Sequence, residues 1–153
     1  MIRLFLRPLV SLFLFVMPHW CCGQGDPVVW RFEAAPVKGQ RTSILITAHL
    51  APGWHLYSQY VKEGGPIPTK FTFDPGKDYI LSEGIREKGN YSKKFYDDIY
   101  EMEITWYTGI VSFEQGITLN KPGATVKGRV EYMTCNSHVC IPAEREFSVK
   151  VNP

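Results

Sequence analysis

Apolar side chains recur at every second position along most of the chain after residue 27. The alternation is clearest in four segments, namely residues 28–33, 42–50, 100–106 and 126–151. A period of two residues is typical of strands that bury one face. Pro, Gly and Asp lie between the segments and indicate turns. No segment after residue 23 shows the 3.6-residue apolar period of a helix. The pattern therefore predicts an all-β protein, an antiparallel β-sandwich of immunoglobulin-like type.

We expect about seven short strands, as in an immunoglobulin-like sandwich. Besides the four segments, we expect short strands at Trp54–Ser58, around Phe71 and Phe73, and at Ile110–Phe113. Residues 79–98 are the least regular part of the predicted domain. Six aromatic side chains are expected to fill the space between the two sheets: Trp30, Phe32, Phe71, Phe73, Trp106 and Phe147.

The last alternating segment carries the candidate chemistry. Residues 126–151 predict two strands joined by a short loop, with Cys135 and Cys140 at its two shoulders. Directly opposed residues in a hairpin bring their Cβ atoms close enough for a disulfide. We therefore expect the cysteine pair to lie at the mouth of one β-hairpin.

The first 23 residues have the features of a signal peptide. They carry Arg3 and Arg7, an apolar stretch at residues 9–17, and small residues before Gln24. The apolar stretch is short for a membrane span. We expect export to the periplasm, cleavage after Gly23, and a single domain at residues 24–153. Cys21 or Cys22 as a lipidation site is a second interpretation, although the preceding Pro18-His19-Trp20 is a poor lipobox.

Cleavage changes both the charge and the cysteine count. Residues 1–23 hold two of the 17 basic residues and none of the 15 acidic residues, so the remaining chain carries no net charge. A balanced chain lacks the basic field of a nucleic-acid-binding protein, and we expect no such partner. Cys135 and Cys140 remain as the only cysteines and are expected to bond to each other in an oxidising compartment.

Three interpretations of the cysteine pair remain open from the residues themselves. A disulfide that closes so short a loop stabilises the fold by only roughly 2 kcal/mol, so it is a weak structural staple. A bond at an exposed hairpin tip is open to thiol–disulfide exchange, and His138 between the cysteines would promote exchange. Alternatively the pair is an inert clip in a binding module. In a third interpretation, Cys135, His138, Cys140 and Met133 bind copper or zinc.

The cysteine hairpin also resembles a known family. The strand Val126–Tyr132, the two cysteines and the following Ile141-Pro142 resemble the end of the periplasmic N-terminal domain of the thiol:disulfide interchange protein DsbD. The segment Gly53–Tyr57 looks like the early GWHLY segment of that family, and Lys94-Phe95-Tyr96 is similar to its cap loop. The resemblance covers nearly all of residues 28–151.

The resemblance implies an immunoglobulin-like carrier of reducing equivalents. Cys135 and Cys140 would be its redox couple, with Cys140 forming mixed disulfides with partners and Cys135 resolving them. Phe95, with Tyr96 beside it, would be a cap that shields the pair. His138, Tyr132 and Pro142 are expected to support the site.

The implied role is that of a protein-disulfide reductase component, for which we expect a monomer without cofactor or resident metal. A membrane-bound thiol reductase or a thioredoxin-like protein would donate electrons. Periplasmic thioredoxin-fold proteins or disulfide isomerases would accept them, as in cytochrome c maturation. The four residues between the cysteines are fewer than in better-known members. The chain has no Cys-x-x-Cys segment, so we expect a separate electron donor.

Overall fold

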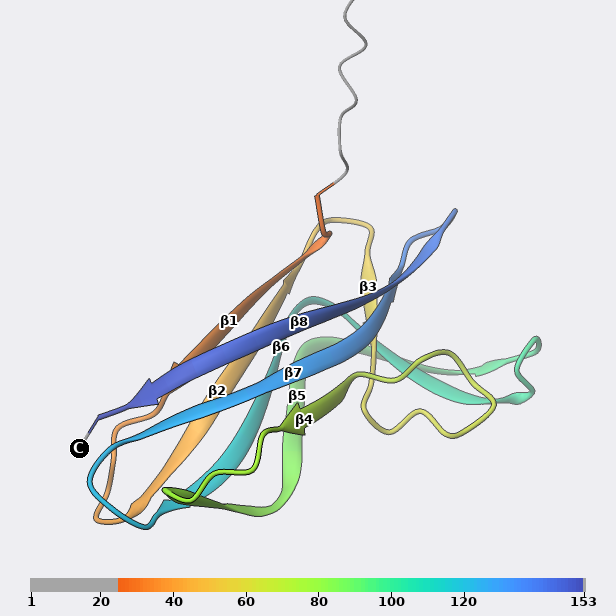
Figure 1. The fold of residues 1–153 in the computed structure, drawn as a ribbon. Helices are drawn as coiled ribbons and strands as arrows, with labels where there is room; N and C mark the ends of the chain where they lie inside the picture. Colours follow the sequence, from red (N-terminus) through yellow and green to blue (C-terminus); the bar gives the residue numbers. More distant parts are fainter. Residues whose placement is uncertain (1–24, 153) are drawn as a thin grey trace, which may run out of the picture.

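The computed structural model describes residues 25–152, and every regular element in this range is a strand (Figure 1). The strands are β1 (Val28–Ala34), β2 (Arg41–Leu50), β3 (His55–Tyr57), β4 (Lys70–Phe73), β5 (Tyr79–Asp97), β6 (Met102–Leu119), β7 (Ala124–Cys135) and β8 (Cys140–Val151). The expected signal peptide, residues 1–23, lies outside the described residues. The described part of the chain has no helix long and apolar enough to cross a membrane.

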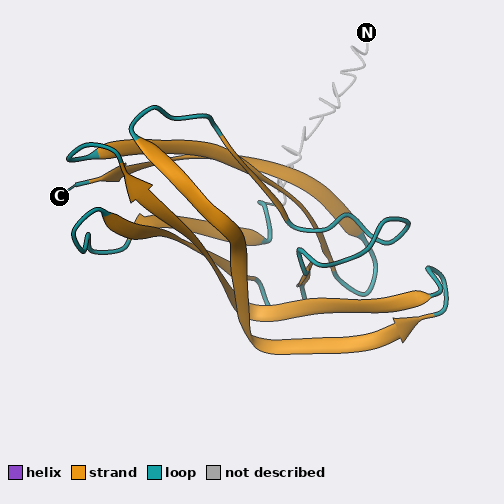
Figure 2. Cartoon of the chain, turned by 90° about the horizontal axis from the view of Figure 1, so that it is seen from below, coloured by secondary structure: helices purple, strands orange, loops and turns teal. Residues whose placement is uncertain are grey.

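The strands form two packed layers that share one short strand. The first layer has the order β1-β2-β6-β5, and the second places β7 between β8 and β4. Strand β3 pairs with β6 on one edge and with β7 on the other, so it joins the layers. All of these pairs are antiparallel. The predicted antiparallel β-sandwich is confirmed (Figures 1 and 2).

The core lies between the layers and follows the predicted alternation. In β2, the five positions from Thr42 to Leu50 with even numbers are each at most 9% exposed, whereas the residues between them are more exposed. Ile46 of β2 lies opposite Phe113 of β6, and both side chains are buried. Burying a side chain of this size contributes about 1.5–3 kcal/mol, so this apolar interface is the main stabilising feature of the sandwich.

Five of the six aromatic residues expected in the core are found there. Trp30, Phe32, Phe71, Phe73 and Phe147 pack against the main hydrophobic cluster. The prediction for Trp106 was wrong, because this side chain packs in a second, smaller cluster. The reason is the alternation of β3, whose Leu56 enters the main core while Tyr57 belongs to the second cluster. Trp106 lies opposite Tyr57 and therefore shares its face.

The prediction that residues 79–98 are irregular was also wrong. Residues 79–97 form β5, a strand of 19 residues that pairs with β6, and only Asp98 lies in a turn. Likewise, separate strands were expected at residues 100–106 and 110–113. From Met102 on, both segments lie in the single strand β6 of 18 residues. Register shifts between Leu81 and Ile85 and between Gly89 and Tyr91 interrupt the pairing. The second shift offsets the pairing by one residue and so moves side chains to the other face, which hides the period of two in the sequence.

Glycines at the second register shift allow β5 and β6 to bend. Gly109 of β6 has a φ of 73°, a conformation that favours glycine. A Cβ atom at Gly89 of β5 would lie 2.0 Å from Cδ1 of Tyr107, so only glycine fits beneath that ring. Beyond the shift, residues 91–108 form a two-stranded projection, called the arm below. Figure 2 shows both strands bending sharply between the sandwich and the arm.

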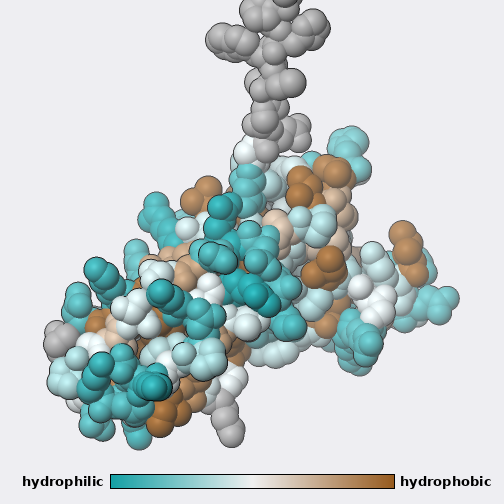
Figure 3. Space-filling view, in the orientation of Figure 1, coloured by the Kyte–Doolittle hydropathy of each residue, from teal (hydrophilic) through white to brown (hydrophobic). Residues whose placement is uncertain are grey.

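The exposed hydrophobic side chains are dispersed over the visible surface. Figure 3 shows them separated by hydrophilic residues, in the orientation of Figure 1. Among the described residues, the most exposed large apolar side chain is that of Ile99, at the tip of the arm. Scattered apolar side chains of this kind are normal for a protein surface. The face seen in Figure 3 therefore shows no large apolar patch.

Candidate functional site

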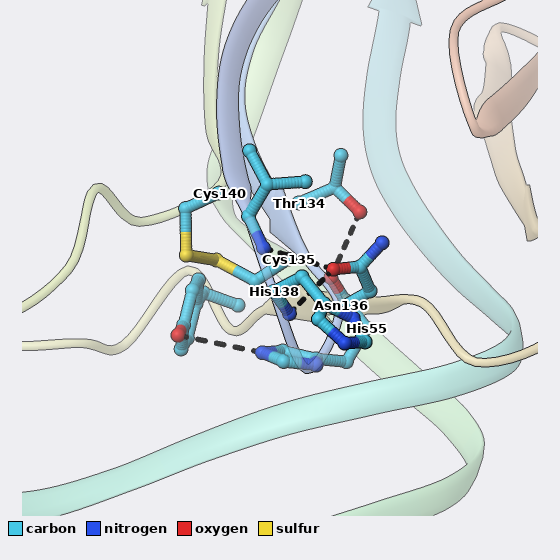
Figure 4. Close-up of a disulfide and its surroundings, with 8 residues drawn as sticks. His55, Thr134, Cys135, Asn136, His138 and Cys140 are labelled. Atoms are coloured by element: carbon cyan, nitrogen blue, oxygen red, sulfur yellow. Dashed lines mark hydrogen bonds between the residues drawn. A yellow bond between two sulfur atoms is a disulfide. The ribbon is translucent and has the colours of Figure 1, made fainter. Parts of the chain in front are cut away.

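Cys135 and Cys140 form a disulfide at the tip of the β7–β8 hairpin (Figure 4). Cys135 ends β7, Cys140 begins β8, and the two residues oppose each other with their Cα atoms 4.1 Å apart. Asn136 closes the turn, because its side-chain oxygen accepts the N–H groups of His138 and Val139 at 2.8 and 2.9 Å. The predicted place of the pair on a β-hairpin is confirmed.

The two cysteines have unequal exposure. Cys135 is 1% exposed, whereas Cys140 is an exposed residue. The difference follows from the strands that carry them. Strand β7 is covered by β3 at Cys135, while β8 pairs only with β7. Exchange requires a sulfur that an incoming thiolate can reach. Cys140 is on the exposed side of the bond, so its sulfur is the one open to attack.

Cys135 belongs to a small hydrophobic cluster outside the main core, called the cysteine cluster below. Its buried members are Cys135, Tyr57 and Ile104, and five partly buried side chains pack against them: Val61, Phe95, Met102, Trp106 and Met133. The members come from β3, the arm, the loop after β3 and β7. The arm therefore forms one wall around the buried cysteine.

Phe95 is part of this wall, and Tyr96 is not. The Phe95 ring lies 4.6 Å from the Trp106 ring, and the Lys93 ammonium lies 5.3 Å from the Phe95 ring centroid. Tyr96 is 60% exposed, as alternation along a strand requires. The expected cap loop is in fact a strand segment, because Phe95 pairs with Ile104 within the arm.

Replacing Phe95 with alanine is expected to speed reduction of the disulfide. An aromatic contact of this kind is worth about 0.5–1.5 kcal/mol, so its loss raises the population of uncovered molecules by up to about tenfold. The measurement is the rate of reduction by excess dithiothreitol. Tyr96→Ala is the matched control and should leave the rate unchanged within about twofold, since that ring lies outside the cluster. Equal rates for wild type and Phe95→Ala would show that Phe95 does not shield the bond.

His55 is the site residue that the sequence analysis did not select. It lies directly opposite Cys135 in the β3–β7 pairing, and its ring centroid is 3.8 Å from that of Trp106. Its Nε2 atom is 3.4 Å from the Tyr57 hydroxyl oxygen. Burial lowers the pKa of His55 to about 4, so the imidazole is neutral at neutral pH. The alternation in Gly53–Tyr57 predicts a strand but gives no indication that the strand lies beside β7.

The three residues expected to support the site lie elsewhere in the hairpin. His138 is exposed in the turn, where its Nδ1 atom is 2.8 Å from the Ser137 hydroxyl. Tyr132 is buried in the main core and donates a hydrogen bond to Asp26. Burial, with this bond, raises the pKa of Tyr132 to about 12. Pro142 is exposed on β8, opposite Met133. None of the three belongs to the cysteine cluster.

The described structure does not assemble the metal site that was considered. Within residues 25–152, no three His, Cys, Asp or Glu side chains are grouped so that they could hold a metal ion. Both sulfur atoms of the candidate set are used in the disulfide. The set of Cys135, His138, Cys140 and Met133 is therefore not a coordination site in this structure.

Comparison with known proteins supports a redox interpretation. The family described as “Thiol:disulfide interchange protein DsbD, N-terminal” matches residues 25–152. Among curated protein sequences, none matches the chain.

Two solved structures share the fold. The N-terminal periplasmic domain of ScsB from Proteus mirabilis is 19% identical with a TM-score of 0.50, and the match covers 80% of this chain and 44% of that one. The reduced N-terminal domain of DsbD from Neisseria meningitidis is 17% identical with a TM-score of 0.57, and the match covers 83% and 87%. Together with the layered strands, these likenesses establish an immunoglobulin-like sandwich.

Proposed function

Because this chain belongs to the family of DsbD N-terminal domains, we propose that it exchanges thiols and disulfides through a reversible Cys135–Cys140 bond. It would carry two electrons at a time between other proteins. The family supports thiol–disulfide interchange as the kind of chemistry. The roles of the individual residues rest on the geometry of the hairpin.

The unequal burial of the two cysteines carries the proposal. In the reduced protein, the Cys140 thiolate attacks a disulfide in a partner and forms a mixed disulfide, and one partner sulfur leaves as a thiolate. Cys135 then attacks the Cys140 sulfur, and the second partner sulfur leaves. The partner gains two electrons, and the Cys135–Cys140 bond forms again. This order requires an accessible Cys140 and a sheltered Cys135, as observed.

The arm would limit access to the pair between encounters. Phe95 and Trp106 of the arm pack against the cluster that contains Cys135. Such a cover slows loss of electrons to small oxidants, while a docking protein can displace it. Unlike a loop, the arm is held by β5–β6 pairing that is unbroken from Tyr91 to Asp97, so movement of the Phe95 side chain is the smallest opening motion.

The family also suggests a location and a class of partners. The related ScsB domain is periplasmic, and an exported chain would meet periplasmic thioredoxin-fold proteins or disulfide isomerases as acceptors. A membrane-bound reductase or a thioredoxin-like protein would supply the electrons, because the described residues contain only one cysteine pair. The mature chain would act as a monomer.

The proposal is tested by the reduction potential of the pair. Equilibration with dithiothreitol buffers, followed by alkylation and mass measurement, gives the fraction oxidised. We expect a midpoint in the range of thioredoxin-like proteins, above about −300 mV. The control is the Cys135→Ser/Cys140→Ser double variant, in which no thiol titrates.

A pair that stays oxidised well below about −300 mV would be a structural bond, and the exchange proposal would fail. The chain would then be an immunoglobulin-like binding module with an inert clip. In that case the free energy of unfolding of the double variant would fall by roughly 2 kcal/mol, and its partner binding would be unchanged.

A further inference from the structure

The resolving step poses a chemical problem at Cys135. The thiolate is the attacking species in thiol–disulfide exchange. Cys135 is 1% exposed and packs against apolar side chains, which favour the neutral thiol over the thiolate. A neighbouring base that accepts the thiol proton would remove this obstacle. This question rests on the proposed function, because only an exchanging pair needs a resolving step.

We propose that His55 is the base that takes the proton of the Cys135 thiol when Cys135 displaces a bound partner from Cys140. The pairing of β3 with β7 places His55 directly opposite Cys135, on the same face of the sheet. Opposed residues in an antiparallel pair have Cβ atoms about 4.5–5.5 Å apart, within reach of a Cys–His hydrogen bond. The two residues lie together beside the hairpin tip in Figure 4.

The surroundings hold the imidazole ring in place. Trp106 packs on the ring with a centroid distance of 3.8 Å, and the Tyr57 ring lies edge-on at 5.2 Å. When Nε2 carries the proton and faces the Tyr57 hydroxyl, Nδ1 is left as the acceptor. A ring held against two aromatic side chains does not need to be ordered during the reaction.

Burial lowers the pKa of His55 and keeps its imidazole neutral, so a ring nitrogen is free to accept a proton. Tyr57 is neutral as well, since burial and then Tyr100 and Asp97 raise its pKa. The Lys93 ammonium lies 5.5 Å from the Trp106 ring centroid. His138 is exposed in the turn of the hairpin. The Asp97 carboxylate accepts two backbone N–H groups at the arm tip.

The proposed step balances in atoms and charge. Before it, Cys140 is bonded to a partner sulfur, Cys135 is a thiol and His55 is neutral. The proton moves to the imidazole, and the Cys135 sulfur bonds to the Cys140 sulfur. The bond from Cys140 to the partner breaks, and the partner sulfur leaves as a thiolate. The imidazolium then gives its proton to that thiolate or to water. Transfer within the pair creates opposite charges side by side, and their attraction offsets the cost of burying them.

The test uses the reduced mature chain and the small disulfide DTNB, which releases a coloured thiolate in each of two steps. Cys140 attack gives the first release, and Cys135 closure gives the second. We expect His55→Phe, which keeps an aromatic ring against Trp106, to slow the second release by about tenfold or more. The first release should change by less than about twofold, since Cys140 is exposed.

The pH profile separates a base from a structural residue. The pKa of His55 lies near 4, so in the wild type the second release should vary little with pH through the neutral range. In His55→Phe it should rise about tenfold per pH unit, because only thiol that has already ionised can react. Cys135→Ser identifies the first phase, as it permits a single release.

His49→Phe is the matched control, since this histidine lies on β2 opposite Val29 and outside the cysteine cluster. It should leave both phases unchanged. The proposal is overturned when His55→Phe leaves the second phase unchanged, slows both phases equally, or keeps the wild-type pH profile. It is also overturned when His138→Gln, and not His55→Phe, slows the second phase.

Failure of this inference differs from failure of the proposed function. DTNB chemistry needs no protein partner, and the reduction potential does not depend on how fast Cys135 reacts. A normal potential with an unaffected second phase would remove His55 alone. A potential well below about −300 mV would remove the exchange function, whatever the DTNB phases show.

Discussion

Cys135→Ser is expected to accumulate covalent complexes with partner proteins, and Cys140→Ser is expected to form few. In Cys135→Ser, the remaining thiol lies on the exposed side of the hairpin and attacks a partner disulfide. No second thiol is present in the site to break the mixed disulfide, so the complex persists. In Cys140→Ser, the remaining thiol is packed in the cysteine cluster, where partners cannot reach it.

The measurement is made on the two variants exported to the periplasm. Acid quenching, alkylation and non-reducing electrophoresis display the complexes, and mass spectrometry identifies the cysteine that forms each one. We expect the yield to differ by about tenfold or more, since exchange rates depend on access to the sulfur. The double serine variant is the control and should form none. Equal yields from the two single variants would contradict the assigned order of attack.

The hairpin could be predicted because its information is local. Alternation on both sides of a short loop places Cys135 and Cys140 opposite each other, and a disulfide between opposed residues needs no knowledge of other strands. The same holds for the inward stripe of β2, from Thr42 to Leu50. In both cases one face is buried continuously, so the period of two survives in the sequence.

The arm could not be predicted, because its pattern is broken and its burial comes from distant segments. Two register shifts interrupt the pairing, and the one after Gly89 is offset by a single residue, so it changes which face the side chains beyond it occupy. Beyond them, Phe95 packs against the cysteine cluster and Tyr96 faces solvent. Two adjacent aromatic residues give no indication of which one is covered, and only the fold decides it.

His55 illustrates a different limit. Its strand has only three residues, and its importance depends on pairing with β7, some 80 residues further along the chain. Single-sequence patterns predict strands but do not assign their neighbours. A histidine in such a strand is therefore indistinguishable from His49 until the sheet order is known.

Glu87→Ala is expected to lower the free energy of unfolding by about 2–4 kcal/mol, a large effect for a single surface-accessible carboxylate. The Glu87 carboxylate accepts hydrogen bonds from the hydroxyls of Ser58 and Tyr107, at 2.8 Å from Tyr107, and from the backbone N–H of Gln59 at 3.0 Å. Ser58 and Tyr107 are both buried, so alanine leaves two hydroxyl groups without their acceptor.

This network lies where the arm joins the sandwich. Tyr107 covers Gly89 at the register shift, and Ser58 begins the loop that leaves β3. Loss of Glu87 should therefore loosen the arm as well as the fold. We expect the disulfide of Glu87→Ala to be reduced several-fold faster by dithiothreitol at a denaturant concentration where the protein is still folded, since local opening costs less free energy than unfolding.

Glu114→Ala is the matched control, because this glutamate on β6 also accepts a hydroxyl hydrogen bond, from Ser43 at 2.8 Å, and pairs with Arg86 at 3.0 Å. Its ion pair is exposed to solvent, and removing it should cost less than about 1 kcal/mol. Urea denaturation of the oxidised proteins gives both values. Equal losses for the two variants would mean that burial of Ser58 and Tyr107 does not distinguish Glu87. Equal reduction rates would show that the arm is fixed by the β5–β6 ladder and not by this carboxylate.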